Sequence, residues 1–140
     1  MISVLLDTDV CLDSITGREP WHADADRIFH ASVEKKVSIF ISGLTFSNLY
    51  YLLRKTHGSR KTVKRLHAMR ELVTVSPINS DVVDRAFDTA WNDFEDALQY
   101  QSALKGGCEL LIARNLPDYK KADQIPVIEP SEFIDRHLNP

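Results

Sequence analysis

The amino-acid sequence predicts an α/β fold, a three-layer α/β/α sandwich with a central, mostly parallel sheet. Short apolar runs at 2–6, 37–41 and 109–113 are rich in β-branched residues and leucine, as is typical of strands buried on both faces. Segments with a helical spacing of apolar residues separate these runs. Because strands that alternate with helices form a parallel sheet through crossover connections, we expect helices on both faces of the sheet.

The predicted elements follow one another along the whole chain. Ile2–Leu6 is the first strand, and Thr8 can cap the short helix after it, which a turn at 17–20 ends. Asn79 or Ser80 can cap a later helix that reaches residue 90. The other expected helices cover 23–36, 44–56, 60–71, Phe94–Lys105 and 131–137, and the other expected strands cover 37–41, 72–75, 109–113 and 126–128.

Length and composition indicate one globular domain, 1–140. Hydrophobic residues make up 44% of the chain, enough for a core, and the formal net charge of −3 argues against a protein that coats nucleic acid non-specifically. The apolar N-terminus lacks a basic segment and reaches Asp7 early, so we expect neither a signal peptide nor a membrane-spanning helix. Cys11 and Cys108 show no metal-binding spacing, and we expect two buried thiols in a cytoplasmic protein.

Three aspartates that are far apart in the sequence lie at the ends of predicted elements. Asp7 follows the first strand and Asp118 follows the strand at 109–113, while Asp96 lies in the first turn of a helix. The carboxyl ends of parallel strands meet at one edge of a sheet, where such folds bind ligands. Carboxylates gathered there repel one another unless they hold a divalent cation such as Mg²⁺ or Mn²⁺. The pattern therefore favours a metal-dependent enzyme that acts on phosphate esters.

Each aspartate also has a purely structural interpretation. Asp7 can cap the turn that follows it, and Asp118 follows a proline in a sequence typical of a loop. Asp93 and Asp96 share a face at the start of one helix, where Asp93 can be the N-cap and Asp96 the third helical residue. The metal-site interpretation therefore depends on the three aspartates occurring together at one predicted edge.

Charged residues are distributed unevenly in the middle of the chain. The segment 81–96 is acidic, with Arg85 as its only basic residue. Three interpretations are open: two solvated helix faces, a basic surface that holds a phosphate backbone beside an acidic metal site, or a docking face for an acidic protein. The basic surface of the second and third interpretations would come from the segment 54–70, which contains no acid. Its basic residues are Arg54, Lys55, Arg60, Lys61, Lys64, Arg65 and Arg70.

Four segments taken together resemble the motifs of PIN domains. In chain order they are LLDTDVCLD, SGLTFSNLYYLLRK, DFEDALQYQSALKGG and LLIARNLPDY, and the resemblance spans nearly the whole chain. PIN domains have a parallel sheet between helices; many are Mg²⁺- or Mn²⁺-dependent ribonucleases, and many small bacterial ones are toxins of toxin–antitoxin pairs of the VapC type. The resemblance implies that Asp7, Asp96 and Asp118 are catalytic carboxylates at a metal site, with Asp93 as a neighbouring acid and Asn115 as a polar group at the rim.

One residue departs from the family pattern. The family usually has a glutamate in a stretch like LTxxEL, where this chain has Asn48. An asparagine can offer a metal its carbonyl oxygen, but it supplies no negative charge and cannot act as a general base. Two hypotheses follow: a metal-dependent ribonuclease in which Asn48 and Asp93 assist the metal site, or a degenerate PIN-like module that binds RNA or a protein partner without cleavage.

The resemblance also bears on partners. If the chain is a ribonuclease, its substrate is RNA, and we expect a role as a toxin to require a cognate antitoxin protein. Members of the family often dimerise, so a homodimer is compatible with the sequence, whereas no membrane partner is expected. The residues expected to hold the RNA are Asn115, Arg54, Lys55, Arg60 and Lys61.

Overall fold

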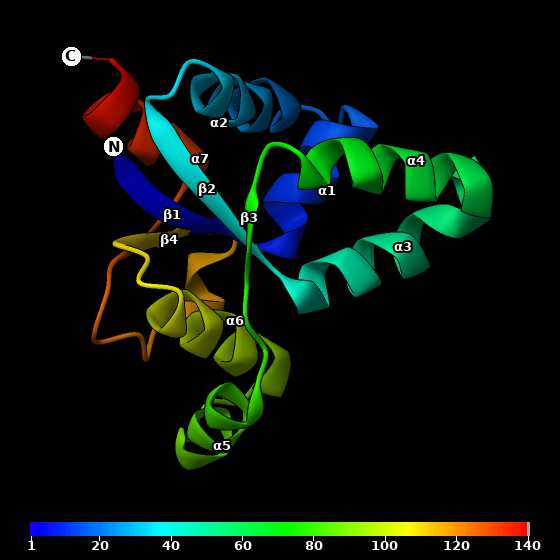
Figure 1. Ribbon diagram of the computed structural model, residues 1–140. Helices are drawn as coiled ribbons and strands as arrows, with labels where there is room; N and C mark the ends of the chain where they lie inside the picture. The colour runs from blue at the N-terminus through cyan, green and yellow to red at the C-terminus, as the bar shows by residue number, and fades with distance from the viewer. Residues whose placement is uncertain (140) are drawn as a thin grey trace.

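The computed structural model describes residues 1–139 and contains a five-stranded sheet in which every neighbouring pair is parallel. The spatial order is β3-β2-β1-β4-β5, with helices on both faces (Figure 1). The predicted α/β/α class is therefore confirmed. The strands are β1 (Ile2–Leu6), β2 (Val37–Ser42), β3 (Thr74–Ser76), β4 (Leu110–Ile112) and β5 (Val127–Ile128).

The helices lie between the strands, near the positions that the sequence predicts. They are α1 (Thr8–Thr16), α2 (His22–Val33), α3 (Gly43–His57), α4 (Ser59–Arg70), α5 (Ser80–Asp88), α6 (Phe94–Lys105) and α7 (Pro130–Phe133), which a π-helical turn, Ile134–Leu138, continues. A 3-10 turn, Leu116–Tyr119, was not predicted. The predicted end of α2 was wrong because Lys35 adopts a left-handed φ of 61°, which stops the helix.

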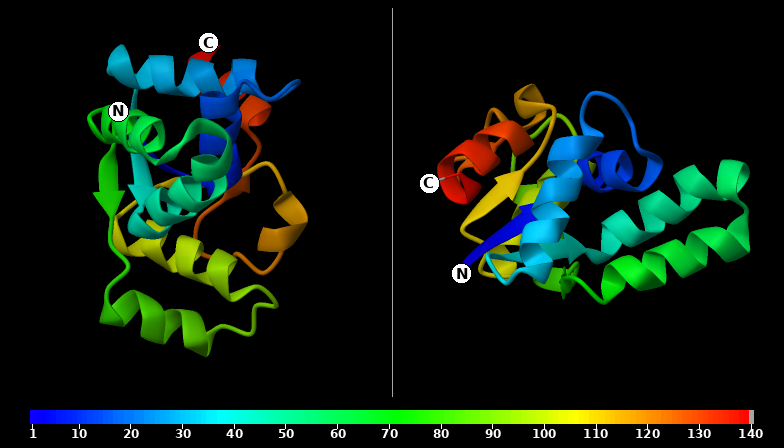
Figure 2. Two further views of the ribbon diagram at one scale, coloured as in Figure 1. Left: turned by 90° about the vertical axis from the view of Figure 1, so that its right-hand side faces the viewer. Right: turned by 90° about the horizontal axis from the view of Figure 1, so that it is seen from above.

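The sheet separates two hydrophobic cores because successive side chains of a strand point to opposite faces. Val4 and Leu6 pack in a core that α1, α2, α3, α4 and α7 complete, whereas Leu5 packs in a core with Tyr100 and Ala103 of α6. Figures 1 and 2 show α2 and α7 on one side of the sheet and α6 on the other, with α5 packed on the outside of α6. Both faces are thus covered, as a parallel sheet requires.

The strand order reverses at the middle of the sheet. From β1 the chain proceeds outward through β2 and β3 on one side, and later through β4 and β5 on the other. Such a reversal leaves a crevice outside the carboxyl ends of the two central strands. The backbone N–H of Asp7 donates to the carbonyl of Ile112 at 3.0 Å, so the end of β1 is tied to the end of β4 at this point.

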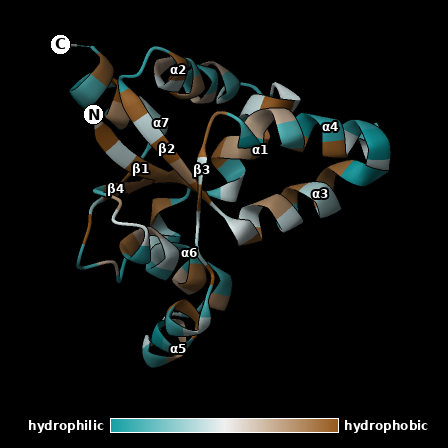
Figure 3. Cartoon of the chain, in the orientation of Figure 1, coloured by the Kyte–Doolittle hydropathy of each residue, from teal (hydrophilic) through white to brown (hydrophobic). Residues whose placement is uncertain are grey.

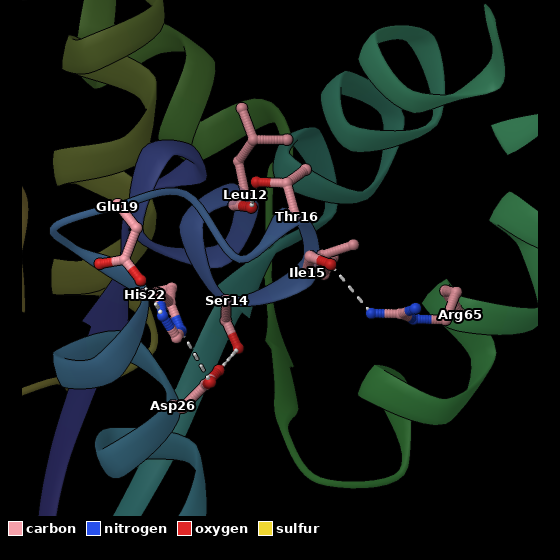
Figure 4. A network of polar contacts seen from close by, with 8 residues as sticks. All are labelled: Leu12, Ser14, Ile15, Thr16, Glu19, His22, Asp26 and Arg65. Atoms are coloured by element: carbon pink, nitrogen blue, oxygen red, sulfur yellow. Dashed lines mark hydrogen bonds and ion pairs between the residues drawn. The ribbon is translucent and has the colours of Figure 1, made fainter. Parts of the chain in front are cut away.

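Helices α3 and α4 form a hairpin that projects from the carboxyl edge of the sheet (Figure 2). Gly58 joins them with a φ of 78°, a left-handed value that favours glycine. Arg65 of α4 donates to the carbonyl of Ile15 at 3.0 Å, and Ser14 donates to Asp26 of α2 at 2.5 Å (Figure 4). These bonds tie α1 to the hairpin on one side and to α2 on the other.

Cys11 and Cys108 are both buried free thiols, as expected. Burial raises the pKa of both, that of Cys108 to about 12, so the two thiols stay protonated and act as small packing groups. Among residues 1–139, no helix combines the length and the apolar character that crossing a bilayer would require.

A buried polar network ties the carboxyl edge together around Gln99 of α6. Its Oε1 accepts a hydrogen bond from Ser42 at 2.7 Å, and its Nε2 donates to Thr45 at 2.8 Å and to Thr8 at 3.3 Å. The hydroxyls of Thr8 and Thr45 are 3.1 Å apart. All four side chains are buried, so the network joins the ends of β1 and β2 to one helix.

We predict that Gln99→Leu lowers the free energy of unfolding by about 1–3 kcal/mol, because Ser42 and Thr45 lose buried partners. Gln101→Leu is the matched control: Gln101 is also buried on α6, but no hydrogen bond of its side chain is seen within residues 1–139. The control should change stability by less than about 0.5 kcal/mol. Urea denaturation of both variants checks this; equal effects would show that the network adds no stability.

Candidate active site

The crevice at the carboxyl edge holds a pocket of about 510 Å³ whose wall is strongly acidic. The pocket joins four parts of the chain: the junction of β1 and α1, the first half of α3, the start of α6 and the 3-10 turn after β4. Three sequence-distant aspartates predicted to meet therefore do meet. The lining residues are Asp7, Thr8, Asp9, Ser47, Asn48, Tyr51, Leu52, Glu95, Asp96 and Asp118.

Asp7 is fixed by its position at the end of β1. Its Oδ1 accepts a hydrogen bond from the backbone N–H of Thr8 at 2.7 Å, so Asp7 is the N-cap of α1. The expectation that Thr8 caps this helix was wrong, because the hydroxyl of Thr8 is engaged in the Gln99 network instead. Capping leaves Asp7 at the pocket wall, so the structural and functional interpretations of this residue are compatible.

Asp96 and Asp93 occupy the first turn of α6 in different roles. The Asp93 side chain accepts a hydrogen bond from the backbone N–H of Asp96 at 3.1 Å, so the N-cap interpretation of Asp93 is confirmed. Asp96 lines the pocket, whereas Asp93 faces a smaller neighbouring cavity that it shares with Asp118. Asp93 therefore orients the helix that carries Asp96 and lies outside the main pocket.

Asp118 and Asn115 form one unit in the turn after β4. The Nδ2 of Asn115 donates to Oδ2 of Asp118 at 2.8 Å. Asp118 reaches the main pocket, and Asn115 does not line it. Asn115 thus holds a pocket carboxylate in place from outside, while the predicted role in binding RNA stays a prediction.

Burial, together with neighbouring negative charge, raises the pKa of two carboxyl groups of the pocket. Burial raises the pKa of Asp7 to about 6, with a further increase from the negative charge of Asp9. Burial also raises the pKa of Asp96 to about 7, and the charges of Asp7, Asp93, Asp118 and Glu95 add to this rise. The folded chain therefore holds these acids close together at an electrostatic cost. Such a cluster matches the chemistry of a site that a cation would neutralise.

Tyr119 is a neutral hydrogen-bond donor beside the acids. Burial, together with the charges of Asp7 and Asp96, raises the pKa of its phenol far above the usual range. Its hydroxyl lies 3.5 Å from Oδ1 of Asp96, to which it donates. The sequence analysis missed this residue, although it directly follows Asp118 in the motif LPDY.

Asn48 contacts an acid that the sequence analysis did not single out as a site residue. The Nδ2 of Asn48 donates to Oε1 of Glu95 at 2.7 Å, and both residues line the pocket. The sequence analysis expected Asp93 to assist the metal site together with Asn48, but Asp93 is outside the main pocket. Glu95 is the acid placed beside Asn48. The signal was present in DFEDALQ, where Glu95 directly precedes Asp96.

The four basic residues expected to hold RNA lie away from the acidic pocket. Arg54 and Lys55 are in the last turn of α3, Arg60 is in α4, and Lys61 lines a separate cavity between the two helices. Arg54 contacts a residue that lines the pocket: its guanidinium lies 4.8 Å from the ring centroid of Tyr51. None of the four forms an ion pair in the described part of the chain.

The acidic side chains of the pocket do not converge on one point as a preformed metal site would. Among residues 1–139, no group of three or more His, Cys, Asp and Glu side chains is placed to hold a metal ion in this arrangement. Several pocket oxygens instead accept hydrogen bonds, as Asp7 does from Thr8 and Asp118 does from Asn115. The donor types suit a hard divalent cation, and the arrangement is an open one.

Known proteins resemble this chain over most of its length. A curated relative, ribonuclease VapC1 of Aquifex aeolicus (strain VF5), is 25% identical over 138 residues, which cover 95% of this chain and 94% of the relative. Among solved structures, DNA-bound VapBC from Salmonella typhimurium superposes with a TM-score of 0.71 at 16% identity, covering 93% of this chain and 99% of that one.

Two more solved structures share the fold. A toxin–antitoxin complex from Klebsiella pneumoniae gives a TM-score of 0.65 at 23% identity, covering 91% of this chain and 97% of that one. VapC20 of Mycobacterium tuberculosis, a sarcin–ricin loop cleaving toxin, gives 0.68 at 17% identity, with 85% and 95% covered. The model of the PIN-domain family matches residues 3–117, which is most of the chain. The protein therefore belongs to the PIN-domain family.

Proposed function

We propose that the protein is a divalent-metal-dependent ribonuclease and the toxin of a toxin–antitoxin pair. One observation carries the proposal: Asp7, Asp96 and Asp118, which are far apart in the sequence, line one pocket at the carboxyl edge of the sheet. Membership of the PIN-domain family and the name of the Aquifex relative, a ribonuclease, support the reaction class. The toxin–antitoxin complexes among the structural neighbours support an antitoxin as partner.

The residues present fit Mg²⁺ or Mn²⁺ by their chemistry. Asp7, Asp96 and Asp118 supply carboxylate oxygens, which hard cations prefer. Burial and, to a smaller extent, neighbouring negative charge raise the pKa of Asp7 and Asp96, and a cation would offset the cost of ionising both groups. Among residues 1–139 these side chains are not already gathered as a set of three or more metal ligands, so we propose that they come together when the cation binds. A bound divalent cation would lower the pKa of a water and offset the charge of the phosphodiester.

The surrounding residues of this chain orient the carboxylates. Tyr119 donates a hydrogen bond to Asp96, Asn115 donates one to Asp118, and Asn48 donates one to Glu95. These bonds leave each carboxylate one oxygen for a ligand. We assign Glu95 the negative charge that Asn48 lacks, because its carboxylate lies beside Asn48 at the pocket wall.

The alternative hypothesis, a degenerate module that binds without cleavage, rests on Asn48. The amide of Asn48 donates a hydrogen bond to Glu95, so a carboxylate lies beside the position where the family glutamate is missing. Cleavage assays decide between the two hypotheses, since the degenerate module binds RNA or a protein partner and leaves RNA intact.

We expect the purified protein to cleave mixed RNA with Mn²⁺ or Mg²⁺ but not with EDTA. Asp96→Asn should lower the cleavage rate by at least about 100-fold, since even outer residues of metal sites commonly contribute about 10- to 100-fold. Asp123→Asn, at an exposed acid outside the pocket, is the matched control and should leave the rate unchanged. Cleavage by Asp96→Asn at the normal rate would sink the assignment of this pocket.

Stability should depend on pH in a direction that the pocket acids set. A carboxyl group with a higher pKa when folded binds its proton more tightly in the folded chain. The stability that it contributes is therefore present below about pH 4 and is lost as the pH rises through about 7. Because Asp96 is half-buried, we expect Asp96→Asn in EDTA to be more stable than the natural chain by about 1–2 kcal/mol at pH 8.

That difference should shrink toward pH 4, and Mn²⁺ should stabilise the natural chain at pH 8 but not Asp96→Asn. Thermal melts across this pH range, with EDTA or Mn²⁺, measure both effects. A variant that is less stable than the natural chain at pH 8 in EDTA would contradict the proposed electrostatic cost of burying Asp96 beside the other acids.

The assignment of Glu95 predicts the outcome of an exchange experiment. Glu95→Gln should weaken Mn²⁺ binding by about 10- to 100-fold, as measured by calorimetry, and adding Asn48→Glu should recover most of the loss by returning a carboxylate to the same wall. Glu129→Gln, at an exposed glutamate outside the pocket, is the control. Unchanged Mn²⁺ affinity in Glu95→Gln would remove Glu95 from the site.

A further inference from the structure

The pocket that holds the acids is also lined by an exposed aromatic side chain. Tyr51 and Leu52 of α3 line the pocket, and 62% and 52% of their surfaces are exposed. The guanidinium of Arg54 lies 4.8 Å from the centroid of the Tyr51 ring, against one of its faces. Tyr51 is therefore an exposed aromatic side chain that lines the same pocket as the carboxylates and is contacted by one cation.

The face of α3 that carries Tyr51 runs from the pocket toward the basic end of the hairpin. Residues three to four positions apart follow one another along one side of a helix. In α3 this side carries Asn48, then Tyr51 and Leu52, then Lys55. At about 1.5 Å per residue, Lys55 lies roughly 10 Å beyond Asn48. In Figure 3 the residues near the tip of the hairpin are mostly coloured as hydrophilic.

This order of groups matches the chemistry of a nucleotide strand. A phosphodiester at the acids would need positive charge along the strand. Arg54 lies over the Tyr51 ring, Lys55 follows one helical turn beyond Tyr51 on α3, and neither forms an ion pair within residues 1–139. An aromatic ring between a reactive site and such cations is the arrangement with which proteins bind single-stranded nucleic acid.

We propose that Tyr51, supported by Arg54, stacks an unpaired base of the RNA next to the phosphodiester held at the acidic pocket, while Lys55 binds the strand's backbone beyond it. The proposal rests on the proposed ribonuclease function and adds that the substrate is single-stranded at this position. A base in a duplex cannot stack on Tyr51, because its faces are covered by neighbouring base pairs.

Binding to a chain that cannot cut tests this independently of cleavage. In the Asp96→Asn background with Mg²⁺, the probe is a short single-stranded RNA of mixed sequence that carries 2-aminopurine, whose fluorescence falls on stacking. Tyr51→Ala should weaken binding by about 5- to 100-fold and abolish the quenching, and Tyr51→Phe should retain both. Val63→Ala, at an exposed apolar residue of α4 outside the pocket, is the control.

The same strand annealed to its complement should bind more weakly than the single strand and show no quenching. The proposal is overturned if Tyr51→Ala binds RNA as tightly as its background, if the duplex is quenched equally, or if no RNA binds. It is also overturned if sedimentation shows that Tyr51→Ala only weakens self-association, because the exposed ring would then belong to a protein interface. A failure of the natural chain to cut RNA would count against the ribonuclease and leave this binding result standing.

Discussion

The burial of several mutually repelling carboxylates in one pocket is the constraint on which the rest of this site depends. Folding brings Asp7, Asp96 and Asp118 to one wall, and the raised pKa values of Asp7 and Asp96 record the cost of doing so. Hydrogen bonds that do not involve the side chains of these acids offset the cost. Gln99 ties α6 to the ends of β1 and β2, and the backbone of Asp7 is bonded to β4. The pocket therefore holds its acids at an electrostatic cost, on an edge of the sheet that hydrogen bonds tie together, as is typical of functional sites.

Much of the fold was predictable because the local sequence signals agree with one another. Ile2–Leu6 is a continuous apolar run followed by a capping aspartate, and Phe94–Lys105 begins at Asp93 and ends at glycine, so their limits were predicted well. Two predicted element boundaries were wrong, the end of α2 and the start of β3, because the backbone conformation there does not follow from the residue types. Lys35 takes a left-handed φ, and Leu72 and Val73 bond back to the end of α4, which delays the start of β3 until Thr74.

The candidate site was predictable in part, for a physical reason. A parallel sheet collects the residues that follow its strands at one edge, so Asp7 and Asp118 could be placed without coordinates. The partner of Asn48 could not be placed, because which side chain reaches Glu95 depends on how α3 and α6 approach each other. The same limit applies to Tyr119 and to the cation–π contact of Arg54, since rotamers and helix packing fix both.

The most direct test of the account is to locate a bound ion. Crystals of the protein soaked with Mn²⁺ would give an anomalous difference map in which the ion is identified without reference to activity. The account predicts a peak in the acidic pocket, in contact with oxygens of Asp7, Asp96 and Asp118. A map with no peak there at saturating Mn²⁺, or with the ion bound at other residues, would contradict it.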